Sequence, residues 1–474
     1  MRPDRWPTRQ VLRMNALPMP DPRAGSRTFP DDFVWGAATA SYQVEGAVHE
    51  EGRGESIWDR FSHTPGRVRN GDTGDVACDH YHRMPDDVAL IAELGLNAYR
   101  FSVSWSRVLP NGTGAVNQAG LDFYDRLVDE LLARDIAPFM TLYHWDLPQA
   151  LEDAGGWPVR ATAEAFAEYA GIVAAKLGSR VRSIATLNEP WVAADHGYRI
   201  GTHAPGRSDP AAALAASHHL LVGHGLGMQA IRAAAPGTAA GIVLNLGPQV
   251  AASSHPLDME AAAEAHDWLN RWYLDPIMGR GYPEAPRWSP GHGQPEVRDR
   301  DMELIASPID FVGVNYYSRN VIRSAGLPPL GPTEQVERTG MGWEVYPAGL
   351  VEVLEFVASR TGALPLYVTE NGAAYPDDAV DPTRDPSRVR FLRRHLEAAL
   401  EAIERGVPLR GYFAWSLLDN FEWAQGYGPR FGIVHVDYGT LERRVRDSGR
   451  LMGAVARSGR LPLEKAADAG VPPA

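Results

Sequence analysis

The stretch SIATLNE at residues 183–189 is mostly apolar and stops at a polar pair, Asn188 and Glu189. The stretch LYVTE at residues 366–370 repeats the pattern and stops at Glu370. Unbroken apolar runs of this kind, without polar alternation, are typical of parallel strands that are covered on both faces. The two stretches therefore predict a parallel sheet in which at least two strands end at an acidic side chain.

Six further apolar runs recur along the chain, with helical patterns between them, such as Leu121, Tyr124, Val128 and Leu131. The eight expected strands are Phe33–Ala38, Ala98–Val103, Ala137–Leu142, Ser183–Leu187, Ala240–Leu244, Phe311–Tyr316, Leu366–Thr369 and Gly411–Trp415. Eight βα units in 474 residues predict an α/β fold with a single closed (β/α)8 TIM barrel. A doubly wound open sheet is the alternative, but no GxGxxG motif follows the first strand.

The two ends of the chain differ from this repeating pattern. We expect residues 29–460 to form the barrel domain, residues 1–28 a disordered N-terminal extension and residues 461–474 a C-terminal tail. The first 28 residues lack the apolar segment of a secretory signal. No stretch approaches the roughly 18 consecutive apolar residues that a membrane span needs.

The charge balance limits the classes of partner. The formal net charge is −13, and Lys176 and Lys465 are the only lysines. Such a chain is not typical of a nucleic-acid or membrane-surface binder, so we expect a soluble protein with a small, neutral partner. The single cysteine, Cys78, cannot form an internal disulfide and favours a reducing, cytoplasmic setting. Whether the chain forms a homo-oligomer stays open.

Polar side chains gather where the predicted strands end, which is where barrel enzymes carry their chemistry. Glu189 and Glu370 stand out, because an acid at the end of a buried strand is expensive to desolvate. Two carboxyl groups that face each other across a barrel mouth meet the requirement of glycoside hydrolysis. The alternative is a structural pair held by arginine, and the two glutamates alone do not decide between these interpretations.

The aromatic content favours a sugar ligand. Seven tryptophans lie at or near predicted strand ends: Trp35, Trp105, Trp145, Trp191, Trp343, Trp415 and Trp423. An indole ring offers a flat apolar platform with one donor, which suits the faces of a hexose, although some of these rings will pack in the core. Side chains that could hold sugar hydroxyls at the same ends are Gln43, His144, Asn188, Asn315 and Glu422.

Seven motifs in order carry a family resemblance: FVWGAATASYQVEG (33–46), RGESIWD (53–59), YRFS (99–102), LYHWD (142–146), TLNEP (186–190), TENG (369–372) and WSLLDNFEW (415–423). Together the motifs resemble the β-glucosidases of glycoside hydrolase family 1 over roughly residues 29–448. The resemblance implies a retaining mechanism with Glu189 as acid/base and Glu370 as nucleophile. It also implies that Arg100, Tyr317 and Asn315 support the nucleophile. Retention requires the two carboxyl groups to lie about 5–5.5 Å apart.

The resemblance also implies the sugar contacts, which are Gln43, His144, Trp145, Asn188, Trp415, Glu422 and Trp423. His203 and Trp343 are candidates for the aglycone side, with plain packing as the alternative. An anionic Glu422 beside the 4- and 6-hydroxyls would repel a 6-phosphate, so we expect an unphosphorylated substrate. No cofactor and no metal are expected, because the run from Cys78 to His82 matches ordinary family sequence rather than a ligand set.

The expected activity is hydrolysis of terminal β-D-glucosyl residues from cellobiose and from aryl or alkyl β-glucosides, with tolerance for β-galactosides and β-fucosides. A transglycosylase with the same covalent intermediate and a non-catalytic sugar-binding barrel are the alternatives. One segment departs from the family. Residues 443–448 read RRVRDS where relatives usually have Arg-x-Pro-Lys-x-Ser, and we expect this to alter tail packing rather than activity.

Overall fold

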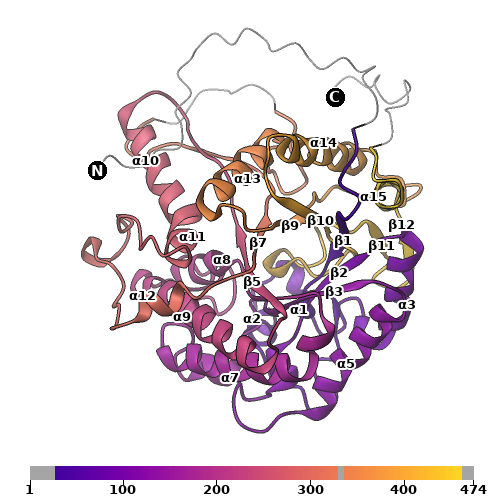
Figure 1. Ribbon diagram of the computed structural model, residues 1–474, viewed down its shortest axis with the longest axis horizontal. Coiled ribbons are helices and arrows are strands. Elements are labelled where there is room, and N and C mark those ends of the chain that lie inside the picture. The colour runs from indigo at the N-terminus through magenta and orange to yellow at the C-terminus, as the bar shows by residue number, and fades with distance from the viewer. Residues whose placement is uncertain (1–26, 329–335, 462–474) are drawn as a thin grey trace.

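A computed structural model describes residues 27–328 and 336–461. Eight parallel strands close into a barrel in the order β1-β10-β9-β7-β5-β4-β3-β2, and they occupy the centre of Figure 1. Their bounds are β1 Val34–Ala38, β2 Ala98–Ser102, β3 Ala137–Tyr143, β4 Ser183–Asn188, β5 Ala239–Asn245, β7 Phe311–Asn315, β9 Leu366–Asn371 and β10 Leu409–Trp415. Each strand expected from the sequence is present, so the predicted (β/α)8 barrel is confirmed.

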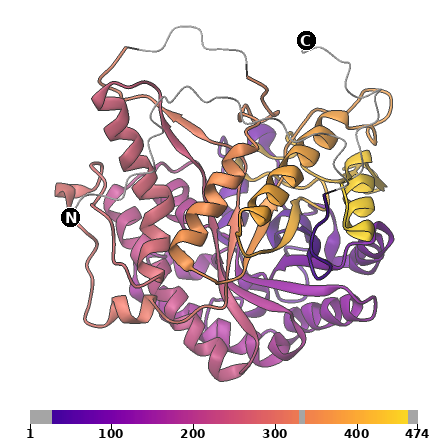
Figure 2. The same cartoon turned by 45° about the horizontal axis from the view of Figure 1, so that its top comes forward.

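Burial on both faces explains why these strands are apolar throughout. Every residue of β2, β4, β7 and β9 is buried, because one face points into the barrel and helices cover the other. The long helices form the outer ring seen in Figures 1 and 2. They are α3 His80–Leu94, α5 Gln118–Leu132, α7 Arg160–Leu177, α9 Pro210–Ala234, α10 Pro256–His266, α13 Ala348–Thr361, α14 Pro386–Glu404 and α15 Asp447–Ser458.

Shorter elements lie in the connections between strands and helices. The short helices are α1 Ser41–Val44, α2 Ile57–His63, α4 Trp105–Val108, α6 Gln149–Asp153, α8 Pro190–Ala194, α11 Trp272–Ile277 and α12 Asp301–Ile305. Two small sheets accompany the barrel. One is the antiparallel pair β11 Val434–Val436 and β12 Arg443–Val445, and the other is the parallel pair β6 Gln249–Ala251 and β8 Asn320–Ile322.

The ends of the described chain meet on the barrel. Most of the predicted extension (1–28) and tail (461–474) lies outside the described residues. Arg27 pairs with Glu404 of α14, and Thr28 forms a bridge with Arg460. Within the described ranges, no helix is long and apolar enough to cross a membrane.

The chain just beyond β9 passes very close to the end of β10. A Cβ added to Gly372 would lie 1.7 Å from the carbonyl oxygen of Trp415, a separation that no side chain tolerates. The glycine therefore lets the chain after β9 pass directly beside the end of β10. This contact brings the segments that carry Glu370 and Trp415 together.

Substituting Gly372→Ala is expected to destabilise the protein by about 3 kcal/mol, because backbone rather than a flexible side chain would have to move. Gly171→Ala in α7 is the matched control. Its Cβ would meet only Ala230 Cβ at 3.7 Å, so helix propensity predicts a gain of up to about 1 kcal/mol. Thermal unfolding followed by circular dichroism measures both, and equal melting temperatures would contradict the close contact.

Candidate active site

Both strands that carry the predicted acids are irregular at their carboxyl ends. Between Ala185 and Asn188, β4 has one residue more than its neighbour β5. Between Val368 and Glu370, β9 likewise has one residue more than β7. A bulge of this kind turns the following side chain to a new direction and is common beside active sites. The two bulges set the directions in which the chain continues into Glu189 and Glu370.

Glu370 is 3% exposed and is held by two donors. Arg100 Nη1 donates to its Oε1 at 2.6 Å, and the Tyr317 hydroxyl donates to its Oε2 at 2.6 Å. Arg100 comes from β2, and Tyr317 follows β7. Both contacts favour the ionised carboxylate, as the sequence analysis predicts for these two residues.

Glu189 is 5% exposed and has a different partner. Asn315 Nδ2 donates to its Oε1 at 2.6 Å. The amide of Asn315 is oriented by Thr369, whose hydroxyl donates to Asn315 Oδ1 at 2.7 Å. Glu189 itself has a positive φ of 48°, which is uncommon for a residue with a side chain and is typical of functional positions. Asn315 thus contacts the acid/base candidate, and its hydrogen bonding also lowers the pKa of Glu370, so its predicted support of the nucleophile stays a prediction.

The two carboxyl groups share one electrostatic environment. Burial and the nearby charge of Glu370 raise the pKa of Glu189 well above its usual range. Burial also raises the pKa of Glu370, but Arg100 and the hydroxyl of Tyr317 act in the opposite direction. Glu189 has a neutral amide where Glu370 has a guanidinium, so the shared proton belongs on Glu189.

Asn188 connects this pair to the rest of the site. Its Oδ1 accepts from Arg100 at 2.6 Å and from Asn315 at 3.1 Å. Its Nδ2 lies 3.1 Å from His144 Nε2. Burial lowers the pKa of His144 well below its usual range, so the ring is neutral and Nε2 accepts this bond. The proton therefore sits on His144 Nδ1, which has no partner among the described residues and is available as a donor.

Aromatic rings surround the pair on one side. The rings of His144 and Trp415 are stacked with centres 5.9 Å apart. The ring centre of Trp423 lies 4.7 Å from that of Trp145 and 4.5 Å from that of Trp58. Trp145 Nε1 donates to the carbonyl of Asn188 at 3.0 Å, which ties this aromatic group to the end of β4.

Gln43 and Glu422 each present an unsatisfied oxygen. Gln43 Nε2 donates to Asn420 and to the carbonyl of Phe421, while Gln43 Oε1 and Glu422 Oε2 are buried without a partner within the described part of the chain. Buried polar atoms normally find partners, so orphaned oxygens in a site fit the hydroxyl donors of a sugar.

Burial and the charge of Glu370 raise the pKa of Glu422 to about 8. The expectation of an anionic Glu422 therefore does not hold for the free site near neutral pH. In its protonated form, Glu422 carries no charge that would repel a phosphate. What disfavours a phosphate is that Arg100, the guanidinium facing the pair, is already engaged by Glu370 and Asn188.

Two predicted tryptophans belong to the core instead. Trp35 packs against Phe29 and Phe33, with ring centres 4.6 and 4.7 Å away. Trp105 is fully buried and stacks on Tyr169 at 5.0 Å. A tryptophan that lies near a strand end in the sequence can therefore pack in the core and need not face the open end of the barrel.

The aglycone candidates lie beside the site. His203 is partly exposed, and its ring is 5.7 Å from that of Trp145. Trp343 is partly exposed, and its ring centre lies 5.3 Å from that of Tyr317, the residue that contacts Glu370. Trp191 follows Glu189 directly on α8 and contacts His196 at 4.9 Å. These positions place aromatic surface next to the carboxyl pair, and the aglycone role stays a prediction.

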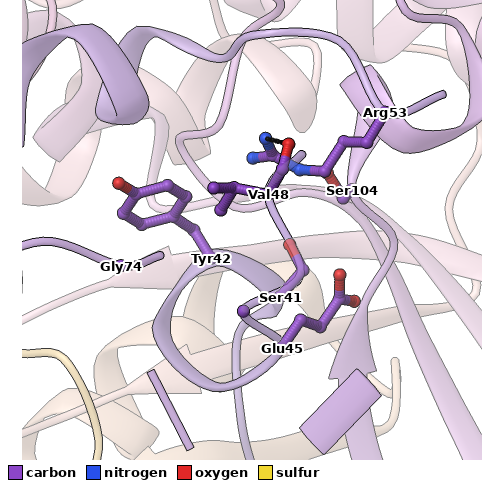
Figure 3. Close-up of a pocket in the computed structure, with 8 residues that line it drawn as sticks. Ser41, Tyr42, Glu45, Val48, Arg53, Gly74 and Ser104 are labelled. Carbon is purple, nitrogen blue, oxygen red and sulfur yellow. Dashed lines mark hydrogen bonds between the residues drawn. The ribbon is translucent and has the colours of Figure 1, made fainter. Parts of the chain in front are cut away.

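Helix α1, which carries Gln43, is anchored by a polar cluster. A small pocket beside it is lined by Ser41, Tyr42, Glu45, Gly46, Val48, Arg53, Gly74 and Ser104 (Figure 3). Glu45 accepts from Arg107 at 3.0 Å and from Tyr124 at 2.6 Å. Because the acidic group of this pocket is already paired, we interpret the pocket as support for Gln43 rather than as a second ligand site.

The histidines near Cys78 do not converge. His80 Nδ1 pairs with Asp87 at 2.8 Å, and His82 Nδ1 pairs with Asp79 at 2.6 Å. The two side chains are used in separate structural contacts.

Sequence reasoning missed several members of the site. Thr369 orients Asn315, and Trp58 packs on Trp423. Thr369 looks like an ordinary strand residue, and only its place directly before Glu370 hints at a role. Trp58 lies far from any predicted strand end, and its only signal in the sequence is its place in the motif RGESIWD (53–59).

Comparisons with known proteins point to one enzyme family. The family model for glycosyl hydrolase family 1 matches residues 25–460. Beta-glucosidase A of Acetivibrio thermocellus is 46% identical over 432 residues, covering 89% of this chain and 96% of that relative. The bifunctional beta-D-glucosidase/beta-D-fucosidase of Bifidobacterium breve is 46% identical over 449 residues, again covering 89% and 96%. The solved family 1 β-glucosidase from Thermotoga maritima has a TM-score of 0.88 at 46% identity, covering 93% and 100%.

Replacing Glu422 with glutamine is expected to stabilise the protein increasingly as pH rises from about 4.5 to about 8. The folded wild type holds a proton that the unfolded chain releases in this window, so its stability falls with pH, whereas the variant has no such proton. Each unit of pKa shift corresponds to about 1.4 kcal/mol, so the gain reaches a few kcal/mol.

Thermal unfolding across this pH window measures the effect. Glu93→Gln, an exposed substitution on α3, is the control and should show no pH-dependent gain. A constant difference between Glu422→Gln and wild type at every pH would contradict the raised pKa.

Proposed function

The chain belongs to glycosyl hydrolase family 1, and on this premise we propose that it is a retaining, exo-acting β-glucosidase in which Glu370 is the nucleophile and Glu189 the acid/base. The observation that carries the assignment is the unequal support of two buried glutamates. Arg100 and Tyr317 contact Glu370, whereas the amide of Asn315 contacts Glu189.

In the first step, Glu370 attacks the anomeric carbon while Glu189 gives its proton to the departing glycosidic oxygen. Arg100 and Tyr317 hold the attacking carboxylate in place, which limits the reorganisation needed during attack. The bond from the anomeric carbon to Glu370 forms as the bond to the leaving group breaks. The product of this step is a glycosyl ester on Glu370.

In the second step, water attacks the anomeric carbon, and the bond from this carbon to Glu370 breaks, which releases the sugar and the free carboxylate. Formation of the ester removes the charge of Glu370, which is the second cause of the high pKa of Glu189. The pKa of Glu189 therefore falls once the ester has formed, and Glu189 can accept the proton of the attacking water. Each inversion at the anomeric carbon reverses the previous one, so the β configuration is retained.

The sugar would be held by the groups that face the pair. Trp415 offers the platform, and His144 Nδ1 is the donor set up by its neutral ring. Gln43 and Glu422 offer acceptor oxygens. Asn188, Trp145 and Trp423 complete the proposed contacts. The proposed substrates are cellobiose and aryl or alkyl β-glucosides, as in cellulose degradation. The bifunctional relative supports β-fucosides as further substrates.

We also propose that residues 29–460 form the catalytic domain, flanked by an extension (1–28) and a tail (461–474). The single cysteine, Cys78, is buried and free. This supports the proposal that the enzyme works in a reducing, cytoplasmic compartment.

Glu370→Ala is expected to abolish hydrolysis of 4-nitrophenyl β-D-glucoside, because the glycosyl ester cannot form without this carboxylate. The effect of Glu189→Ala on kcat/KM, which reports the first step, should depend on the leaving group. The value of kcat/KM should fall about 10²–10⁴-fold on cellobiose, whose leaving group needs a proton, and much less on a dinitrophenyl glucoside, whose leaving group departs without one. Steady-state kinetics on the three substrates measure both variants.

Reversed behaviour would contradict the assignment. If Glu370→Ala kept near-native activity, or if Glu189→Ala lost equally on all leaving groups, the two roles would be wrong. Near-equal melting temperatures of variants and wild type serve as the folding control.

Proton NMR of the first-formed product tests retention directly. Hydrolysis of an aryl β-glucoside should release β-glucose first, with the α anomer appearing only as mutarotation proceeds. If the α anomer accumulated first, the enzyme would be inverting and Glu370 would not form a covalent ester.

A further inference from the structure

The segment that departs from the family contains a buried arginine that reaches toward the active site. Arg446 is fully buried. Its Nη1 donates to Asp419 Oδ1 and to the carbonyl of Gly432, both at 2.7 Å. Its Nη2 pairs with Asp377, and its Nε donates to the carbonyl of Pro382 at 3.0 Å. One side chain thereby joins the loop after β9 to the loop after β10.

Asp419 lies in the loop between Trp415 and Glu422, two of the proposed sugar contacts. It is fully buried, and the charge of Arg446 helps to hold its pKa well below the usual range. Its Oδ1 also accepts from the amide of Gly432 at 2.9 Å, and its Oδ2 accepts from Arg430 at 3.2 Å. These donors hold the carboxylate of Asp419 in place within the loop.

The same cluster holds the loop that follows the nucleophile strand. Asp377 lies in the chain beyond Glu370 and pairs with Arg446. Arg388 of α14 donates to the carbonyl of Ala373 at 3.1 Å and to the carbonyl of Arg430 at 2.6 Å. The loops after β9 and β10 are thus joined through buried guanidinium groups.

Contacts from this cluster continue into the site. The amide of Ser416 donates to the carbonyl of Phe431 at 3.2 Å, and the ring of Phe431 lies 6.3 Å from that of Tyr317. The amide of Phe421 donates to the carbonyl of Gln43 at 3.2 Å. A shift of the loop at Asp419 would therefore be transmitted to several groups that face the sugar.

A metal does not explain the cluster. Asp377, Asp419 and His435 offer ligand atoms within 4.8 Å of one another, the one such group found in the described residues. However, Arg446 and Arg430 already contact both carboxylates. Positive charge is supplied by these side chains, so the acids are satisfied without an ion.

We propose that Arg446 is a positioning residue for sugar binding, acting through Asp419 on the loop that carries Glu422 and Trp423. The inference rests on the proposed function of these two residues. It revises the expectation that the departure at residues 443–448 affects tail packing alone, because the arginine at this position contacts the loop directly.

Arg446→Met tests the proposal, because it removes the charge and all five side-chain hydrogen bonds, the fifth of them to His435, while keeping an unbranched side chain. A misplacement of about 1 Å can cost about 10²-fold, so kcat/KM on 4-nitrophenyl β-D-glucoside should fall on the order of tenfold to hundredfold. Most of the loss should appear as a raised KM. Arg446→Lys should recover part of it, since an ammonium can pair with Asp419 but cannot make every bond of the guanidinium.

Arg360→Met is the matched control for a buried ion pair. Arg360 pairs with Asp275 at 2.8 Å, and its side chain is 8% exposed. Asp275 lies on α11, away from the loops after β9 and β10. It should lower the melting temperature without raising KM. If Arg446→Met changed KM no more than Arg360→Met does, Arg446 would be merely structural.

A double-mutant cycle with Glu422→Gln identifies the route of the effect. If Arg446 acts through the loop, its loss should matter less once Glu422 is already altered, so the combined loss in kcat/KM is smaller than the product of the single losses. Independent, multiplying losses would overturn the proposal.

Two further readouts keep the result interpretable. If Arg446→Met does not fold, the cycle is run with Arg446→Gln, which also removes the charge, and an unchanged KM of that variant would overturn the proposal. A crystal structure of the folded variant needs no turnover, and an unmoved 416–423 loop would also overturn it. Wild-type hydrolysis of the same glucoside reports separately on the proposed function.

Discussion

Two carboxyl groups in one water-poor site must hold different charges, and most of the active site follows from this constraint. Burial alone would raise the pKa of both and leave them alike. Arg100 breaks the symmetry, because its guanidinium contacts Glu370 and Asn188 but not Glu189. The remaining polar groups can be understood as supports for this unequal arrangement.

The barrel supplies the rigidity that such an arrangement needs. Arg100 projects from a fully buried strand. Glu370 lies in β9 and Glu189 directly follows β4, and both of these strands are buried at every position. Local irregularities then set the details, since bulges in β4 and β9 turn the chain just before each acid. Gly372 allows the next segment to pass against β10. The regular strands fix where the two acids lie, and the bulges and Gly372 fix the directions in which the chain continues beside them.

Much of this could be predicted from the sequence, and the limits have physical causes. The strands were predictable because burial on both faces leaves an unbroken apolar run, and Glu189 and Glu370 were predictable as acids that end such runs. The bulges were not, because an extra residue in a strand leaves the apolar pattern intact. The raised pKa of Glu422 depends on its burial and on the nearby charge of Glu370, and the contacts of Arg446 depend on a loop that no local sequence pattern describes.

Asn188 serves two tasks with one amide group. Its oxygen helps to fix Arg100, and its nitrogen faces His144 beside the proposed sugar. A substitution of Asn188 is consequently expected to change both the sugar preference of the enzyme and the pH at which it is most active. A lineage or an engineer that changes position 188 to accept a different hexose also disturbs the guanidinium that keeps the nucleophile charged, so the two properties must evolve together.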